Sequence, residues 1–258
     1  MRLMKRILSA AAVLALSASL LVGCSSGTAS SVPVSASSAA ESTVSSVEET
    51  ASSAVDENEA AAAQLLNDLT GSYQELWPVI LADEYKQTWL DDCTALVGED
   101  NAEAAFEKLS SMVTGDVYGE DAVKAYANGG GAYFCGFTNS LAILTFDGET
   151  STISGTDKDG NVLFSHTYHY IGTEPVHGLY EFESDDADSG EFTYFFLAPD
   201  TSAETYHIEF RYGSDADALS QYDAGDYAYW LASGISTDCD QTMIDNCIKL
   251  FCTENLAG

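Results

Sequence analysis

Apolar residues follow two different spacings along this chain, and the change falls near residue 130. Between residues 61 and 126 they recur every three or four positions, which is typical of amphipathic helices. The first helix is expected to extend from Leu65 to Trp77, with Tyr73 on its apolar face. It should end or kink at Pro78, because proline lacks the backbone N–H that a helix interior requires.

From Ala132 to Gly213 the chain consists of short segments rich in aromatic and β-branched residues, separated by turn signals such as Asp147-Gly148. The segments read AYFCGF, LAILTF, TISGTD, VLFSHTYHYIG, GLYEFES, EFTYFFLA and TYHIEFRYG. Many short strands at close spacing favour an antiparallel sheet that closes into a barrel or a sandwich. After Ser214 the helical spacing returns. We therefore predict a mainly β fold, an antiparallel barrel or sandwich with helices at both ends.

Residues 1–23 have three basic residues near their start, no acid, and an apolar run from Ile7 to Val22. This order is typical of a secretory signal, and the run is shorter and richer in Ala and Ser than a membrane span. The sequence Leu21-Val22-Gly23-Cys24 is similar to the lipobox of bacterial lipoproteins, in which the cysteine is lipidated and becomes the first mature residue. We expect a lipid anchor on Cys24 and a position at the extracytoplasmic face of the cell membrane. An ordinary secreted protein is the alternative.

A Ser/Ala-rich segment with scattered acids and few large apolar residues follows over residues 24–62. This composition is typical of a flexible tether. The remaining residues, 63–258, have a normal length for one domain and are expected to fold as one.

The chain is strongly acidic, with 9 Lys and Arg against 41 Asp and Glu and a formal net charge of −32. A field of this sign repels phosphate groups, so we expect no binding to nucleic acid. The same field raises the local concentration of cations. Aromatic residues make up 11% of the chain, far more than a disordered acidic protein contains, so part of it must bury a core.

A histidine and a carboxylate two residues apart are the clearest candidates for binding chemistry. His207 and Glu209 lie in a strand-like segment, where alternation puts them on one face. Imidazole and carboxylate are ligands of zinc and of related cations. A solvent-facing pair without a metal is the alternative. Of the other histidines, His166 and His169 should face opposite sides of a strand, and His177 should lie in a loop.

Other motifs give less support to a site. Asp157 to Asn161 begins like a calcium loop, but Val162 and Tyr168 stand where such a loop needs Gly and Glu, so we expect a hairpin turn. Five cysteines follow Cys24 without a C-x-x-C spacing and are expected to be buried small residues; a single disulfide is compatible with this interpretation. The sequence contains no catalytic triad, nucleophile elbow, phosphate-binding loop or dinucleotide fingerprint, so we expect no enzymatic activity.

Three stretches between residues 67 and 258 resemble the ZinT (YodA) family of zinc-binding domains. Tyr73-Gln74-Glu75-Leu76-Trp77-Pro78-Val79-Ile80 is similar to a helix near the start of that family. Residues 178–182 and 195–199 resemble its central strands, and residues 207–215 resemble its His-x-His strand and the turn that follows. The resemblance implies a lipocalin-like barrel with flanking helices.

The family binds zinc through three histidines, whose positions fall here at Phe195, His207 and Glu209. Phe195 cannot bind metal, His207 is retained, and Glu209 is a weaker but usable donor. The resemblance thus implies that zinc or another divalent metal binds at His207 and Glu209, with another acid or histidine completing the set, and passes to an uptake system such as a metal ABC transporter. The alternative is a lipocalin-like module for a small apolar ligand, or an interaction module, with a degenerate metal site. Phe195 would suit an apolar cavity.

Overall fold

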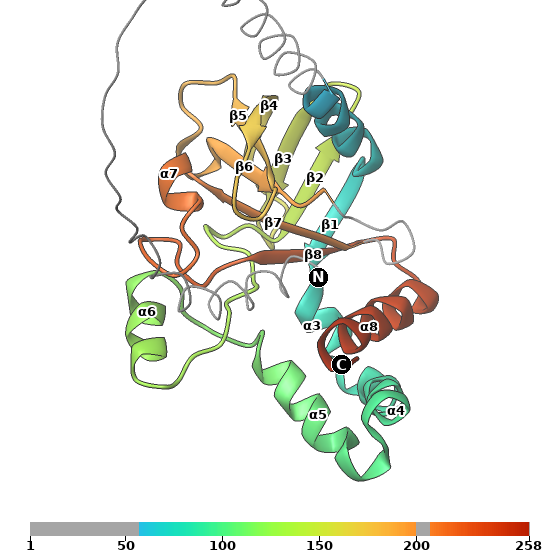
Figure 1. Cartoon of the computed structure of the whole chain (residues 1–258). Helices are drawn as coiled ribbons and strands as arrows, with labels where there is room; N and C mark the ends of the chain where they lie inside the picture. Colours follow the sequence, from blue (N-terminus) through green and yellow to red (C-terminus); the bar gives the residue numbers. More distant parts are fainter. Residues whose placement is uncertain (1–56, 200–206, 258) are drawn as a thin grey trace, which may run out of the picture.

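A closed barrel of eight antiparallel strands forms the centre of the molecule (Figure 1). The computed structural model describes residues 57–199 and 207–257. Each strand pairs with the next along the chain, and the first pairs with the eighth. The predicted lipocalin-like barrel with flanking helices is confirmed. The signal segment, Cys24 and the rest of the chain up to residue 56 lie outside the described residues.

The strands follow one another around the barrel in chain order, and most of the helices lie before the first strand, between the first and second strands, and after the last. The strands are β1 (Gly71–Glu75), β2 (Ile143–Asp147), β3 (Thr152–Thr156), β4 (Val162–Thr173), β5 (Tyr180–Ser184), β6 (Tyr194–Leu197), β7 (His207–Gly213) and β8 (Ala232–Ser236). The labelled helices are α3 (Leu76–Ile80), η1 (Asp83–Tyr85), α4 (Lys86–Val97), α5 (Glu99–Ser111), α6 (Glu120–Ala127), η2 (Gly190–Phe192), α7 (Ala216–Leu219) and α8 (Gln241–Leu256). Within the described ranges, no helix has the length and apolar character needed to cross a bilayer.

Alternation along the strands sends one row of side chains into the barrel. On β4, Phe164 and Tyr168 are buried, whereas Ser165 and Thr167 are exposed. Phe195 of β6 lies against both buried rings, at centroid distances of 5.9 and 5.4 Å, although β5 separates the two strands. Because such contacts form across the concave side of a curved sheet, these aromatic residues fill the barrel interior.

The turn between β3 and β4 is the expected hairpin. The Asp157 carboxylate accepts hydrogen bonds from the backbone N–H groups of Asp159 and Asn161, each at 2.9 Å. Gly160 has φ +81°, a left-handed conformation that favours glycine. The acidic residues that begin like a calcium loop therefore serve to shape a turn.

The helices α3, α4, α5 and α8 gather at one end of the barrel (Figure 1). Their contact is aromatic: the ring of Phe251 lies 4.8 Å from Trp77 and 5.8 Å from Trp89. Trp89 also contacts Phe106 of α5 and donates its indole N–H to the carbonyl oxygen of Ile80 at 2.7 Å. This cluster attaches the helices to α3, which follows directly from β1.

The predicted helix from Leu65 to Trp77 is wrong. Residues 57–68 are helical, but β1 begins at Gly71 and a new helix, α3, begins at Leu76. Tyr73 is a strand residue whose ring lies 5.7 Å from Phe146 of β2. Pro78 lies in the first turn of α3, where a backbone N–H has no helical partner to lose.

Two boundaries drawn from the sequence also need correction. Residues 57–62, which the sequence assigned to the tether, are helical, and Ala62 is fully buried. The barrel extends beyond residues 132–213, because β1 and β8 complete it. The segment AYFCGF forms no strand of the barrel and contributes only isolated bridges of Phe134 to Thr114 and Trp230.

Candidate functional site

Strand β7 carries both residues that the sequence singled out, and both of its faces are buried. Phe210 and Tyr212 face the barrel interior, where their rings lie 6.4 and 5.3 Å from that of Phe195. By alternation, His207 and Glu209 share the outer face, as the sequence predicted. They are 4% and 3% exposed, so the chain covers this outer face almost completely.

Two cysteines lie close to the outer face of β7. Glu209 is paired in register with Ser233 of β8, whose N–H donates to the carbonyl oxygen of Cys135 at 3.0 Å. Burial, and next the charge of Glu209, raises the pKa of the Cys135 thiol, and the same two causes raise the pKa of Cys247 on α8 to about 12. Both thiols are therefore protonated at neutral pH. His207, Glu209 and these thiols bring metal-ligating side chains to one region, but in the described parts of the chain no three such groups are placed to hold a metal ion.

Burial also fixes the protonation state of His207. It lowers the pKa of the imidazole to about 3, so the ring is neutral at physiological pH. The neutral ring is the form that binds metal ions.

The other three histidines have carboxylate partners at two places, just after β5 and in the β4–β5 connection. His166 Nδ1 lies 2.8 Å from Asp186 Oδ2. His169 Nδ1 lies 2.7 Å from Asp185 Oδ1. His177 is in a turn, as predicted, with its Nδ1 3.3 Å from the carboxylate of Glu174. His166 stacks on Phe164 at the inner face of β4, whereas His169 is on the exposed face, so these two do face opposite sides. These three histidines therefore pair with carboxylates that lie outside β7, whereas the neighbours described around Glu209 are cysteines and a serine. The expected completion of the set by another histidine is not seen.

The position carried over to Phe195 does not join this site. Phe195 is fully buried and is paired in register with Tyr212, on the inner face of the barrel. Glu209 instead lies beside Ala198, whose N–H donates to the Glu209 carbonyl oxygen at 2.9 Å. Since one-residue steps change the face of a strand, Phe195 and the pair His207–Glu209 lie on opposite sides of the sheet. The three positions implied by the resemblance are therefore not one cluster.

Arg211 is a buried cation on the outer face of β7 that sequence reasoning missed. It is fully buried and donates to the backbone carbonyl oxygens of Leu219, Gln221 and Tyr227. Its guanidinium carbon lies 4.2 Å from the centroid of the Tyr222 ring. Arg211 therefore attaches the segment between α7 and β8 to the barrel. The signal available was a basic residue inside a strand-like run of a chain with only 9 Lys and Arg.

A buried carboxylate accompanies this cation. The Tyr222 ring lies 3.9 Å from that of His177, and Glu174 next to His177 is fully buried. Glu174 accepts the N–H groups of Val176 and His177 at 2.8 and 2.6 Å. Although burial acts to raise it, these hydrogen bonds and the His177 ring hold the pKa of Glu174 below its ordinary value. The carboxylate is thus ionised and balances the charge of Arg211.

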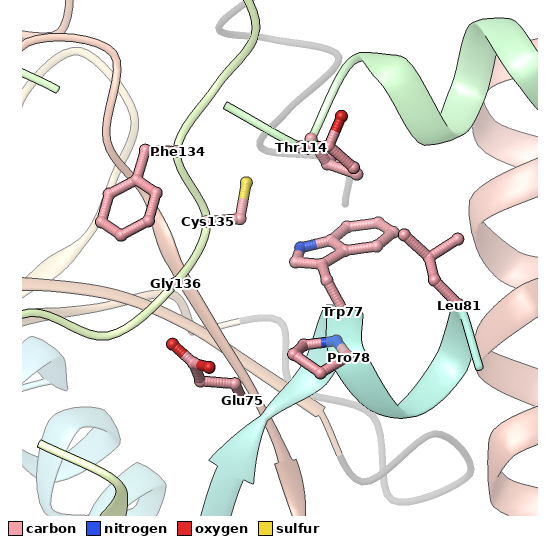
Figure 2. A pocket seen from close by; sticks show the side chains of 9 residues that line it. Glu75, Trp77, Pro78, Leu81, Thr114, Phe134, Cys135 and Gly136 are labelled. Carbon is pink, nitrogen blue, oxygen red and sulfur yellow. The ribbon is translucent and has the colours of Figure 1, made fainter. Parts of the chain in front are cut away.

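A pocket of about 360 Å³ opens where β1 passes into α3 (Figure 2). It is mostly apolar, with a few polar groups, and is lined by Glu75, Trp77, Pro78, Leu81, Val113, Thr114, Phe134, Cys135 and Gly136. The indole nitrogen of Trp77 faces the sulfur of Cys135 across the pocket (Figure 2). Sequence reasoning missed this pocket because its walls come from segments that are far apart in the chain.

The solved structures that are similar to this one include two that contain Zn(II). The Zn(II)-bound ZinT-like domain of Streptococcus pneumoniae AdcA is 15% identical, covers 71% of this chain and 89% of that one, and gives a TM-score of 0.45. Zn(II)-bound AdcA from Streptococcus pneumoniae is 14% identical, covers 75% of this chain and 35% of that one, and gives a TM-score of 0.41. The sequence matches no family model and no curated protein. Both similarities are too distant to assign a ligand or a residue role to this chain.

Proposed function

We propose that this chain is a lipid-anchored, extracytoplasmic binding protein for a divalent metal ion, zinc first, and not an enzyme. The observation that carries the proposal is the pair His207 and Glu209 on one buried face of β7. The imidazole is neutral, which is the form that coordinates a metal ion, and the carboxylate would supply a negative charge.

The metal is bound weakly in this proposal. Zinc sites in proteins have three or four protein ligands, and the described residues offer no ready set of three. Water would fill the remaining positions unless a thiol moves in. Cys135 and Cys247 are the nearest candidates, since a zinc ion deprotonates a thiol that coordinates it. Weak binding suits a protein that passes its metal to an uptake transporter.

Zinc titration of the full chain by calorimetry tests the site. We expect His207→Ala to weaken binding at least tenfold and Glu209→Gln to weaken it less, because the amide still offers an oxygen. The matched control is His169→Ala, which removes an exposed histidine that also has a carboxylate partner. A loss in the control with no loss in His207→Ala would place the metal at the surface. A wild type that binds no divalent metal would refute the proposal.

The anchor is tested separately by cell fractionation. The proposal places the lipid on Cys24, so Cys24→Ser should move the protein from the membrane fraction to the soluble fraction. The control is Cys239→Ser, which changes a half-buried cysteine of the folded part and should leave the protein in the membrane fraction. A Cys24→Ser protein that stays with the membrane contradicts the anchor and leaves the metal site untouched.

A further inference from the structure

We propose that the pocket beside Trp77 is a second binding site, for a small organic cation that carries an ammonium group on an apolar body. Neither His207 nor Glu209 lines it, and the two sites meet only at Cys135, the candidate thiol ligand, which lies in the pocket wall. The volume of about 360 Å³ lies in the lower part of the range of about 300–1,000 Å³ that is typical of ligand pockets.

The walls of the pocket are held rigidly before any ligand binds. Trp77 is 6% exposed and is fixed by an edge contact with Phe251 of α8. Phe134 is stacked on Tyr118, with 5.6 Å between centroids and 9° between ring planes. Aromatic faces attract organic cations through the ring quadrupole, and Trp is the best of them. Rigid walls also lower the entropy cost of binding.

One carboxylate gives the pocket its charge. The Glu75 Oε1 atom accepts the N–H of Phe137 at 2.6 Å, which fixes the side chain, and in the described part of the chain Oε2 has no donor from the protein. No Lys, Arg or His lines the pocket.

These features determine which charge a ligand of the pocket should carry. An anion would meet Glu75 without a compensating cation, in a chain whose net charge is −32. A neutral apolar molecule would gain favourable contacts with the walls of the pocket but no attraction from the carboxylate. An organic ammonium ion gains both interactions: its charge is attracted by Glu75, and its apolar body packs against Trp77 and Phe134. The Thr114 hydroxyl is a further polar group of the pocket.

Calorimetry on the full chain tests the proposal with three probes of similar size: 2-phenylethylammonium, the neutral 2-phenylethanol and the anion 3-phenylpropionate. We expect the ammonium probe to bind at least tenfold more tightly than the other two. Glu75→Gln should remove this preference while still accepting the N–H of Phe137. Thr114→Phe should fill the pocket from an exposed position and weaken the ammonium probe at least tenfold, without touching the core.

Two controls separate this site from general attraction to an acidic protein and from the metal site. Glu107→Gln removes one exposed charge on α5 and should change binding of the ammonium probe less than twofold. His207→Ala should likewise change binding of the ammonium probe less than twofold. Equal binding of the three probes, no binding of any, or an equal loss in Glu107→Gln would overturn the proposal. A loss in His207→Ala would show that the cation occupies the proposed metal site instead.

Discussion

Strand β7 turns one set of side chains toward the barrel interior and another toward the helices and loops outside, and both sets are buried. Ile208, Phe210 and Tyr212 on the inner face are at most 2% exposed. On the outer face, His207, Glu209 and Arg211 are at most 4% exposed. The two faces therefore differ in chemistry and hardly at all in burial.

The difference shows what each face contributes. The inner face packs rings against rings and stabilises the barrel through burial of apolar surface. The outer face contains a buried cation whose hydrogen bonds reach three backbone carbonyl groups of one covering segment. Hydrogen bonds depend on direction, so these bonds determine where the covering segment lies. The rings of the inner face, in contrast, would tolerate replacement by other apolar side chains of similar volume.

The largest effect is expected at Arg211. Arg211→Met leaves three carbonyl oxygens, two of them buried, without their donor and leaves Glu174 without its compensating charge, so the free energy of unfolding should fall by about 3–5 kcal/mol. Urea denaturation measures it. Lys108→Met, an exposed basic residue of α5, is the control and should stay within about 0.5 kcal/mol. A loss below about 1 kcal/mol would mean that the outer face does not depend on its cation.

A histidine placed on the inner face sharpens the comparison. Phe195→His replaces a fully buried ring by a smaller polar one, so we expect a loss of about 2–4 kcal/mol of stability and no gain in zinc affinity. Denaturation and zinc calorimetry measure the two quantities. Phe195→Leu, which keeps the position apolar, should lose less stability than Phe195→His. Tighter zinc binding in Phe195→His would contradict the pairing of Phe195 with Tyr212.

The outer face should also make stability depend on pH. The unfolded chain protonates His207 as the pH falls through about 6.5, whereas the folded chain does so only near pH 3, so the folded state loses stability between these values. From pH 7.5 to 5.5 this amounts to about 1.4 kcal/mol. His207→Gln should remove this part of the pH dependence in urea melts with chelator present. His169→Gln is the control, and an unchanged slope in His207→Gln would show that the buried imidazole already carries a proton.

The smallest effect concerns the helix that contributes Cys247 to the region outside β7. Asp240 caps α8 by accepting the N–H of Met243 at 2.9 Å. Asp240→Ala should lower the free energy of unfolding, measured by urea denaturation, by about 1 kcal/mol. Asp238→Ala, two positions earlier and exposed, is the control for the lost charge. Equal losses in the two variants would assign the effect to charge instead of to the cap.

The strand-rich middle of the chain could be predicted most directly where one face of a strand is exposed. In β4 the apolar and polar positions alternate, and turns such as Asp157 to Asn161 are visible in the sequence. Strand β8 has both faces covered and consists of ASGIS, so it carries neither alternation nor large β-branched residues except Ile235. Its position in the barrel follows from tertiary pairing, which a local pattern does not contain.

The candidate site was also predictable in part. Alternation correctly put His207 and Glu209 on one face, but it does not say which face points into the barrel. That depends on the register of β6 against β7, which separates Phe195 from the pair. The role of Arg211 and the pocket at Trp77 depend on segments that meet only in the folded chain, such as residues 219–227 and 134–136.

The pairing of β1 with β8 brings Tyr73 beside Ser236 and has a consequence for synthesis. A ribosome releases β1 early and β8 only near the end, so the growing chain cannot close its barrel until almost all of the domain has emerged. Until then β1 and β7 each lack one ladder of backbone hydrogen bonds. Closure by such distant residues is a late and slow event. The nascent chain thus stays open for most of its synthesis, the state in which a polypeptide is threaded through a membrane channel, and this suits the export that we propose.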